Sequence, residues 1–335
     1  MATDAYSSRD RIRPFGIGMS ERTFRWITVA ALLLIAIALP FVVSNYRTFQ
    51  FTLMIAYAIA LLGLNILTGY NGQISLGHGA FFALGSYVTA IMMDRWGVPY
   101  WSTIPAAALV CGVAGFLFGV PALRLEGLYL ALATFALALA APQILKHKGI
   151  DAWTGGVQGI AIIKPNAPFG LPISADQWLY LFALAVAIVM FTVGSRLVRG
   201  RVGRALIATR DHPTAAAAMG VNTALYKSLT FGVSALFTGV AGALSAIAVQ
   251  FVAPDSFGFL LSISLLVGII VGGVASISGA IYGAAFIEFI PNIADSFSKS
   301  APWAVYGLLL VACVYVMPTG VAGTIQSILR RFLRR

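Results

Sequence analysis

The stretch FLLSISLLVGIIVGGVASISGAIYGAAFIEFIPN (259–292) contains a single charged residue, Glu288. As one helix it would be about 50 Å long, because each residue adds about 1.5 Å, whereas the hydrocarbon core of a bilayer is about 30 Å thick. The sequence therefore predicts two helices, 259–275 and 277–292, with a break inside ASISGA (275–280), where small and turn-forming residues gather. A stretch of this kind places the chain in a membrane.

The rest of the chain has the same character. Of its 335 residues, 59% are hydrophobic and 10% are charged, and the mean hydropathy is +0.89. A soluble domain has about 25% charged residues, so the composition predicts an all-α, polytopic bundle of transmembrane helices. The net charge of +11 does not indicate a nucleic-acid partner, because the basic residues lie in short loops and tails. Cys111 and Cys313 each stand alone in an apolar run, without the spacing of a metal site.

About ten apolar segments are long enough to cross a bilayer, for which a helix needs roughly 20 residues. The run that begins at Trp26 has no cleavage site of small residues after it, which indicates a retained first helix rather than a signal peptide. The predicted spans are 26–43, 51–68, 75–93, 103–120, 127–145, 178–195, 228–251, 259–275, 277–292 and 302–318.

The basic residues indicate the orientation of these spans. With ten spans both termini lie on one side, and that side then holds 16 of the 22 arginines and lysines, against 6 on the other side. Positive charge favours the cytoplasm, so both termini are predicted to be cytoplasmic. The chain then divides into a cytoplasmic N-terminal tail (1–25), a transmembrane domain (26–322) and a basic cytoplasmic C-terminal tail (323–335). An outer loop (146–177) and an inner loop (196–227) are the two long connections.

A polar segment, GYNGQISLGHGAFF (69–82), lies between two apolar runs. Polar groups and irregular backbone at membrane depth are tolerated only where protein or a water-filled cavity satisfies them, so the segment suits a pathway for a small polar solute. A tight inner turn whose polar side chains cap helix ends is the alternative. The histidine between two glycines is more typical of a hydrogen bond between helices than of a proton shuttle. The candidate pathway residues are Asn71, Gln73, Ser75, His78 and Gly79.

The inner loop begins with basic residues and continues as DHPTAAAAMG (211–220). Asp211 or Thr214 can cap a short helix with Pro213 in its first turn, the alanines favour that helix, and Gly220 ends it. A short helix with small side chains can enter a groove of a partner protein. A solvated amphipathic linker is the alternative interpretation.

A weak sequence similarity links ISLGHGAFFALGS (74–86) with ISLLVGIIVGGVAS (263–276). Paired, glycine-interrupted segments are typical of the inverted repeats of transporters. Glycines also simply allow helices to pack closely, so an inverted repeat and close packing both remain open at this point.

Signatures of enzymes are missing from the sequence. It has no G-x-x-x-x-G-K-[ST] phosphate loop, no H-E-x-x-H and no G-x-S-x-G, so we expect a subunit with no ATPase site, catalytic residue, metal or cofactor of its own. Near the spans, Glu126 lies beside Arg124 at the cytoplasmic end of one helix, and Glu288 can snorkel outward or be buried for function. A carrier driven by an ion gradient usually needs more intramembrane carboxylates than these. A membrane-embedded enzyme is supported by no constellation of side chains.

Five ordered motifs resemble the permease subunit of bacterial branched-chain amino-acid ABC transporters, in particular the second, longer permease of the high-affinity system. The resemblance covers roughly residues 30–322. The motifs are TGYNGQISLGHGAFFALGSYVTA (68–90), LRLEGLYLALATFA (123–136), TGGVQGI (154–160), GRALIATRDHPTAAAAMGVN (203–222) and GGVASISGAIYGA (272–284).

The resemblance implies an importer in the bacterial inner membrane. Its partners would be a second homologous permease, two cytoplasmic ATPases that bind ATP and Mg, and a periplasmic solute-binding protein. Urea, short-chain amides or other amino acids are alternative substrates, because similar permeases carry them. The resemblance also places the polar segment near the translocation path and the inner loop against an ATPase. The residues expected to couple to the ATPase are Arg204, Arg210, Asp211, His212, Ala216, Ala217 and Gly220.

Overall fold

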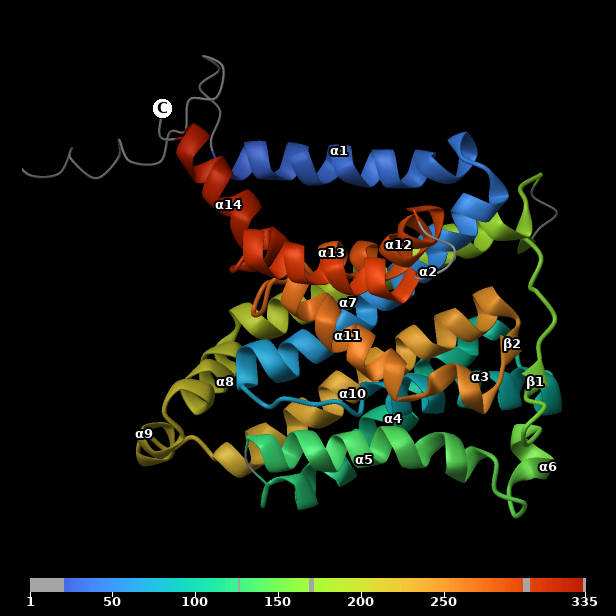
Figure 1. The fold of residues 1–335 in the computed structure, drawn as a ribbon, viewed down its shortest axis with the longest axis horizontal. Helices are drawn as coiled ribbons and strands as arrows, with labels where there is room; N and C mark the ends of the chain where they lie inside the picture. Colours follow the sequence, from blue (N-terminus) through green and yellow to red (C-terminus); the bar gives the residue numbers. More distant parts are fainter. Residues whose placement is uncertain (1–20, 126, 169–171, 298–301, 334–335) are drawn as a thin grey trace, which may run out of the picture.

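The computed structural model describes residues 21–125, 127–168, 172–297 and 302–333, and this part of the chain is almost entirely helical (Figure 1). Its two short strands, β1 (Ile160–Ala161) and β2 (Phe251–Val252), pair antiparallel. The helices are α1 (Glu21–Val42), α2 (Asn45–Asn65), the π-helix η1 (Ile66–Tyr70), α3 (His78–Trp96), α4 (Tyr100–Ala122), α5 (Leu128–Leu145), α6 (Asp151–Thr154), α7 (Ala175–Arg199), α8 (Arg201–Asp211), α9 (Pro213–Ala218), α10 (Thr223–Val249), the 3-10 helix η3 (Pro254–Phe257), α11 (Phe259–Gly272), α12 (Gly279–Phe297), α13 (Pro302–Val316) and α14 (Gly320–Leu333).

The all-α, polytopic class is confirmed. Within the described residues, seven helical stretches are long and apolar enough to cross a membrane, and each of the ten predicted spans overlaps a helix. The seven stretches are Asn45–Tyr70, Tyr100–Ala122, Leu128–Leu145, Ala175–Arg199, Thr223–Val249, Pro254–Gly272 and Gly307–Ile328.

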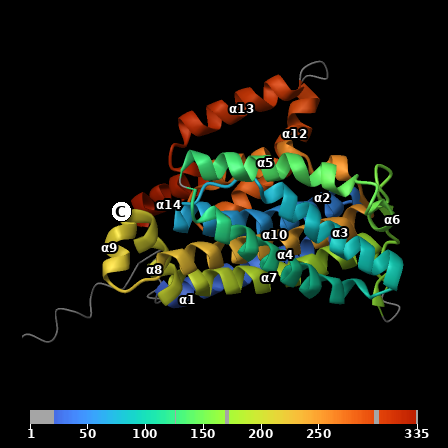
Figure 2. The ribbon, with the colours of Figure 1, turned by 90° about the horizontal axis from the view of Figure 1, so that it is seen from below.

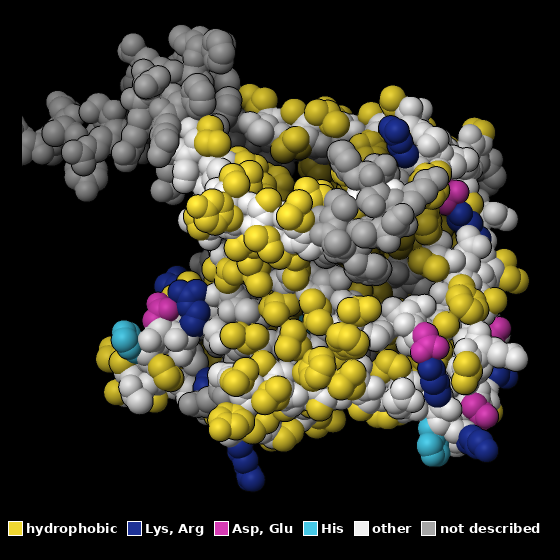
Figure 3. Space-filling view, in the orientation of Figure 1, with side chains coloured by type: hydrophobic (Ala, Val, Ile, Leu, Met, Phe, Trp, Pro, Cys, Tyr) yellow, Lys and Arg dark blue, Asp and Glu magenta, His cyan; other side chains and the backbone are white. Residues whose placement is uncertain are grey.

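Most of the long helices run side by side, and the short elements lie at their two ends (Figures 1 and 2). Helices α8 and α9 project at one end, and α6 lies with β1 and β2 at the other. The start of α1 and the end of α14 lie at the α8–α9 end. On the face shown in Figure 3, hydrophobic side chains cover the middle of the molecule, and most of the charged side chains lie towards the two ends. This distribution suits a protein surrounded by lipid.

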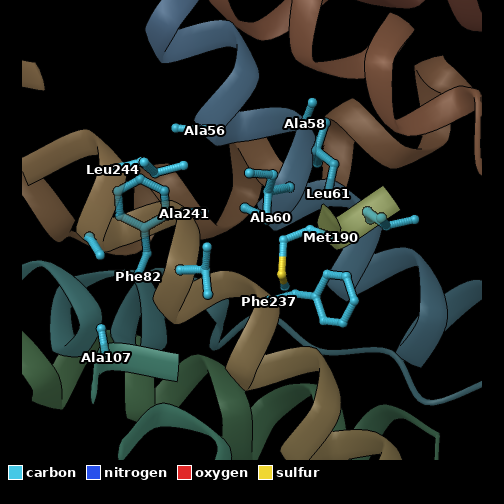
Figure 4. Close-up of a cluster of buried hydrophobic side chains, with 14 of the residues drawn as sticks. Ala56, Ala58, Ala60, Leu61, Phe82, Ala107, Met190, Phe237, Ala241 and Leu244 are labelled. Atoms are coloured by element: carbon cyan, nitrogen blue, oxygen red, sulfur yellow. The ribbon is translucent and has the colours of Figure 1, made fainter. Parts of the chain in front are cut away.

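The core of the bundle is built around α10 and α2. In the most apolar window of each, 83% of the α10 residues and 67% of the α2 residues are buried, against 11% in the stretch Gly307–Ile328. Figure 4 shows side chains from several helices meeting in this core, and its labelled residues are Ala56, Ala58, Ala60, Leu61, Phe82, Ala107, Met190, Phe237, Ala241 and Leu244. Half of these are alanines, so the backbones of neighbouring helices approach closely.

Glycines bring α3 against α10. A Cβ atom added to Gly85 would overlap the backbone of Gly239, and one added to Gly242 would overlap the carbonyl group of Phe82. The hydroxyl of Ser86 donates to the carbonyl of Gly242 (2.9 Å). Small residues therefore act here as a packing surface, as one interpretation of the glycine pattern expected.

The predicted break between the two C-terminal apolar segments is confirmed. Helix α11 ends at Gly272 and α12 begins at Gly279. The loop between them is held by Asn65 of α2, whose Oδ1 accepts from the Ala275 N–H (2.8 Å) and whose Nδ2 donates to the Ser276 carbonyl (2.8 Å). A buried amide thus replaces part of the hydrogen bonding that the interrupted helix lacks.

A second interruption separates α2 from α3. The α-helix ends at Asn65 and continues as one turn of π-helix to Tyr70, after which residues 72–77 have no helical structure and α3 begins at His78. The sequence predicted a helix from residue 75, which was early by three residues. The prediction missed the π-helical turn, because its residues, ILTGY, carry no pattern that distinguishes a π-helix from an α-helix.

The inner loop is helical for most of its length. The short alanine helix is confirmed as α9, and Gly220 follows it with a φ of +85°, a conformation that favours glycine. The predicted caps were wrong, because His212 occupies the N-cap position and no side chain caps α9. Asp211 is the last residue of α8, and its carboxylate accepts from Nε of Arg210 (2.9 Å) instead.

Candidate functional site

The polar segment between η1 and α3 has no regular secondary structure over residues 72–75, and one edge of it is buried. Asn71, Gln73 and Ser75 are buried, whereas Ile74 between them is 45% exposed. In the part of the chain that the structure describes, neither the N–H nor the C=O of Ile74 has a hydrogen-bond partner. Such backbone is stable at membrane depth only against protein or in a water-filled space, so this edge is suited to a partner subunit or an aqueous path rather than to lipid.

A chain of hydrogen bonds fixes the entry into α3. Oγ of Ser234, on α10, donates to the carbonyl of Gly63 (2.7 Å), so this hydroxyl must accept from Nε2 of His78, 2.6 Å away. Nδ1 of His78 is then the acceptor for the hydroxyl of Ser75 (2.9 Å). The histidine is therefore neutral with its proton on Nε2, and it joins α2, α3 and α10. This agrees with the predicted hydrogen bond between helices.

Two further side chains anchor the backbone of the segment. Oγ1 of Thr134, on α5, accepts from the N–H of Leu76 (2.9 Å), and Oγ of Ser262, on α11, accepts from the N–H of Gly79 (2.9 Å). Sequence reasoning missed both partners. A lone threonine or serine inside an apolar helix carries no local sign that it serves a segment elsewhere in the chain.

The inner end of the segment contains an unusual amide. Both side-chain polar atoms of Asn71 are buried and have no hydrogen-bond partner among the residues that the structure describes. Its neighbour Gln73 is satisfied, because Nε2 donates to the carbonyl of Lys227 (3.1 Å) near the start of α10. A buried amide without partners costs about 1–3 kcal/mol, so Asn71 is expected to gain a partner in another state of the protein.

The structure thus brings all five candidate pathway residues together at one junction of α2, α3, α5, α10 and α11. Ser75 and His78 are fully buried, so their side chains serve packing and hydrogen bonding in this conformation. Residues 72–75 have no regular secondary structure and Gly72 has a φ of +75°, so the alternative of an inner turn stays open. A role in the translocation path stays a prediction for this segment.

The predicted coupling residues fall into two groups. Ala216 is only 5% exposed, so in this conformation its side chain offers little surface to a partner, and its coupling role stays a prediction. Met219, which the sequence analysis did not select, is 85% exposed just after α9. The predicted coupling residues that are exposed are Arg204, Arg210, Asp211, His212, Ala217 and Gly220.

Arg210 points back towards the membrane helices. Its Nη1 donates to the carbonyl of Gly69 at the end of η1 (2.6 Å). The sequence analysis expected this arginine to contact an ATPase, whereas the structure joins it to the polar segment.

Comparison with known proteins identifies the group to which this bundle belongs. The profile of the family described as "Branched-chain amino acid transport system / permease component" matches residues 46–317. The chain belongs to this family.

Individual relatives agree with the family match. The chain is 33% identical over 308 residues to the high-affinity branched-chain amino acid transport system permease protein LivM of Salmonella typhimurium, an alignment that covers 85% of this chain and 72% of that protein. It is 32% identical to LivM of Escherichia coli (86% and 72% covered) and 25% identical to LivH of Escherichia coli (81% and 92% covered). No solved structure matches the chain.

The outer loop of the permease is fastened to the segment that precedes α11. Gly155, Gly156 and Gly159 of the motif TGGVQGI have φ values of +70°, +55° and +74°, which explains the glycines. The motif leads directly into β1, which pairs with β2. The Lys146–Asp255 ion pair (2.5 Å) reinforces this connection.

A hollow of about 460 Å³ opens between α2 and α12 of the permease. Gln50, in its wall, is only 8% exposed. Phe51 and Phe289 meet edge to face beside it (ring centroids 5.3 Å apart). The complete lining is Val43, Arg47, Gln50, Phe51, Phe289, Asn292 and Ile293. Polar and aromatic groups around one hollow suit a small solute that has both polar and apolar parts. The sequence alone did not predict this hollow.

The titratable side chains that the structure describes form no metal-binding cluster. Within the described residues, no three His, Cys, Asp or Glu side chains lie close enough to hold a metal ion. Glu288 is partly buried in α12, and its backbone carbonyl accepts from Nδ2 of Asn292 (2.9 Å). Cys111 is fully buried.

Proposed function

We propose that the chain is one permease subunit of an ABC importer that moves branched-chain amino acids across the bacterial inner membrane. It pairs with a second, homologous permease and with two cytoplasmic ATPases, and a periplasmic binding protein delivers the solute. The observation that carries the proposal is the family match over residues 46–317, together with relatives named as branched-chain amino acid permeases. Urea, short-chain amides and other amino acids are the alternative substrates.

The energy source is proposed to be a separate ATPase that docks on α9. The sequence has no phosphate loop, so energy must arrive by contact with another chain. Helix α9 projects beyond the long helices and presents Ala217 and the 85%-exposed Met219 (Figure 1). An exposed methionine beside alanines outside the apolar belt is suited to a groove of a protein partner.

Reconstitution in liposomes tests this function. The permease is purified with its partner permease and ATPases, and uptake of labelled leucine is measured with the binding protein and ATP. We expect uptake that requires ATP and both additional subunits, with competition by valine and isoleucine. Uptake by the chain alone, driven by an ion gradient, would instead establish a secondary transporter, and competition by urea only would change the substrate class.

Ten spans with cytoplasmic termini remain the proposed topology. We predict that a cysteine at Ile163 is labelled only from outside and a cysteine at Thr214 only from inside, in a background in which Cys313 is replaced by serine. Ile163 is 89% exposed and Thr214 is exposed on α9. Membrane-impermeant maleimide on intact cells and on inverted vesicles gives the measurement. Labelling of both positions from the same face would refute the single span between them, α7, and with it the ten-span topology.

An inverted repeat is also proposed. Each half contains a long helix, a connecting segment without α-helix and a second helix: α2 with η1, residues 72–77 and α3 in one half, and α10, residues 250–258 and α11 in the other. In Figure 1, α3 begins towards the α8 end and α11 begins towards the α6 end, which gives opposite directions. The weak sequence similarity between 74–86 and 263–276 does not align the start of α3 with the start of α11, because residue 263 already lies inside α11.

Asn71 is proposed to serve the translocation cycle. We predict that Asn71→Leu lowers leucine uptake at least about fivefold while the melting temperature is unchanged or higher, because the substitution removes two unsatisfied polar atoms at similar volume. Gln73→Leu is the matched control, and it should lower the melting temperature because it breaks the bond to Lys227. Normal uptake by a stable Asn71→Leu permease would leave the amide without a role in transport.

A further inference from the structure

We infer that Arg210 is a positioning residue that links the ATPase-docking helix α9 to the polar segment, so that movement of α9 is transmitted to residues 69–73. The inference rests on the proposed docking of an ATPase at α9. The link has two parts, one on each side of α9 in the chain.

The first part is the Arg210 side chain itself. Its Nη1 donates to the carbonyl of Gly69 (2.6 Å), and its Nε donates to the carboxylate of Asp211 (2.9 Å), which holds the guanidinium in place. Bonds from a charged donor are shorter and stronger than those between neutral groups. Because the acceptor is a backbone carbonyl, the link acts on the chain and not on a mobile side chain.

The aliphatic part of the same side chain also contacts the segment. Gly72 has a φ of +75°, and a Cβ atom added there would lie 2.7 Å from Cγ of Arg210. Any larger residue at this position would therefore push the arginine away. The glycine of the motif NGQ lets the backbone lie directly against the arginine stem.

The second part lies after α9. The Lys227 carbonyl, in the second turn of α10, accepts from Nε2 of Gln73 (3.1 Å). The chain from residue 210 to residue 227 thus touches the segment at both ends, with α9 between the two contacts. His212 alone separates α8 from α9, and its N–H donates to Ala208 while its C=O accepts from Ala216. A displacement of α9 must therefore move Arg210.

Gly69 is well placed to pass such a movement on. A Cβ atom added to it would meet Oδ1 of Asn65 and the backbone nitrogen of Ala275, both closer than contact distance. The residue that Arg210 holds therefore lies against the break between α11 and α12. The hydrogen bond from Arg210 to Gly69 therefore reaches the place where the interruption between α2 and α3 lies against the break between α11 and α12.

The test compares arginine variants in the complete complex. In liposomes containing the second permease and the ATPases, we expect Arg210→Ala to keep normal co-purification of the ATPase and normal basal hydrolysis. Leucine uptake and hydrolysis stimulated by the binding protein should fall at least about tenfold. Arg210→Lys should recover a large part of both, because a single carbonyl can be reached by an ammonium group. Arg201→Ala, which removes an exposed arginine from the same helix, should behave as wild type.

Three results would overturn the inference. Unchanged uptake in Arg210→Ala means that the contact transmits nothing. Loss of ATPase co-purification means that Arg210 belongs to the docking surface. If Arg210→Ala and Arg210→Lys lower the melting temperature and the uptake to the same extent as each other, the arginine has a purely structural role. Failure of the wild-type complex to take up leucine with ATP would contradict the proposed function instead, whatever the arginine variants do.

Discussion

Replacing Ala217 with tryptophan is expected to weaken binding of the ATPase strongly while the permease remains folded. Ala217 is an exposed residue of α9, whereas its neighbour Ala216 is buried. A large ring on the exposed side must fit into a groove that accepts a methyl group, and overpacking of this kind costs about 1–3 kcal/mol. That corresponds to roughly 5- to 150-fold weaker binding. Co-purification of the ATPase and stimulated ATP hydrolysis in liposomes measure both consequences.

A matched tryptophan on another helix provides the control. Ala136 is exposed on α5, and Ala136→Trp should leave ATPase binding unchanged. Ala216→Trp is uninformative about docking, because it is expected to disrupt the packing of α9 on α8 before any partner arrives. Unchanged co-purification and hydrolysis in Ala217→Trp would move the docking surface away from α9, most reasonably to the inner loop around Arg124.

Replacing Gly85 with leucine is expected to prevent the permease from folding. Gly85 of α3 lies directly against the backbone of Gly239 in α10, so a side chain there can be placed only by moving the two helices apart. Helix α10 carries the most buried window of the bundle. A leucine side chain at this position would meet backbone atoms, which cannot move aside by changing rotamer. The loss in free energy of unfolding should therefore be at least about 3 kcal/mol, a large share of the stability of a typical protein.

Detergent extraction followed by size-exclusion chromatography and thermal melting measures this loss. Gly307→Leu is the matched control, because a Cβ atom at that helical glycine would meet nothing within 4 Å. It should give a normal peak and a normal melting temperature. A stable, monodisperse Gly85→Leu protein would show that α3 and α10 can separate, and would weaken the account of the core as a glycine-packed pair.

Several features of this fold follow from local pattern. Hydropathy located the helices because each apolar run must satisfy its backbone within itself in lipid. The break between α11 and α12 followed from length alone, because 34 residues cannot form one spanning helix. Proline, four alanines and glycine predicted α9, since Pro213 suits a first turn and Gly220 suits the left-handed conformation that ends the helix.

The orientation of α9 shows the limit of local pattern. Residues 215–218 are all alanine, so the sequence contains no periodicity from which a buried face could be distinguished from an exposed one. Only the packing of α9 against α8 and α10 separates the buried Ala216 from the exposed Ala217. For this reason the sequence could not distinguish Ala216 from Ala217 as the residue that a partner reaches.

By itself, the sequence determined the membrane class, the positions of the helices and the clustering of polar residues at 69–82, because these depend on composition and spacing along the chain. The tertiary structure alone decided what those polar residues do. His78 bonds to Ser234, 156 residues away, and Arg210 bonds to Gly69, 141 residues away. Such pairs depend on how far each helix is rotated and shifted against its neighbours, and contacts such as that of Gly85 with Gly239 set this arrangement in three dimensions.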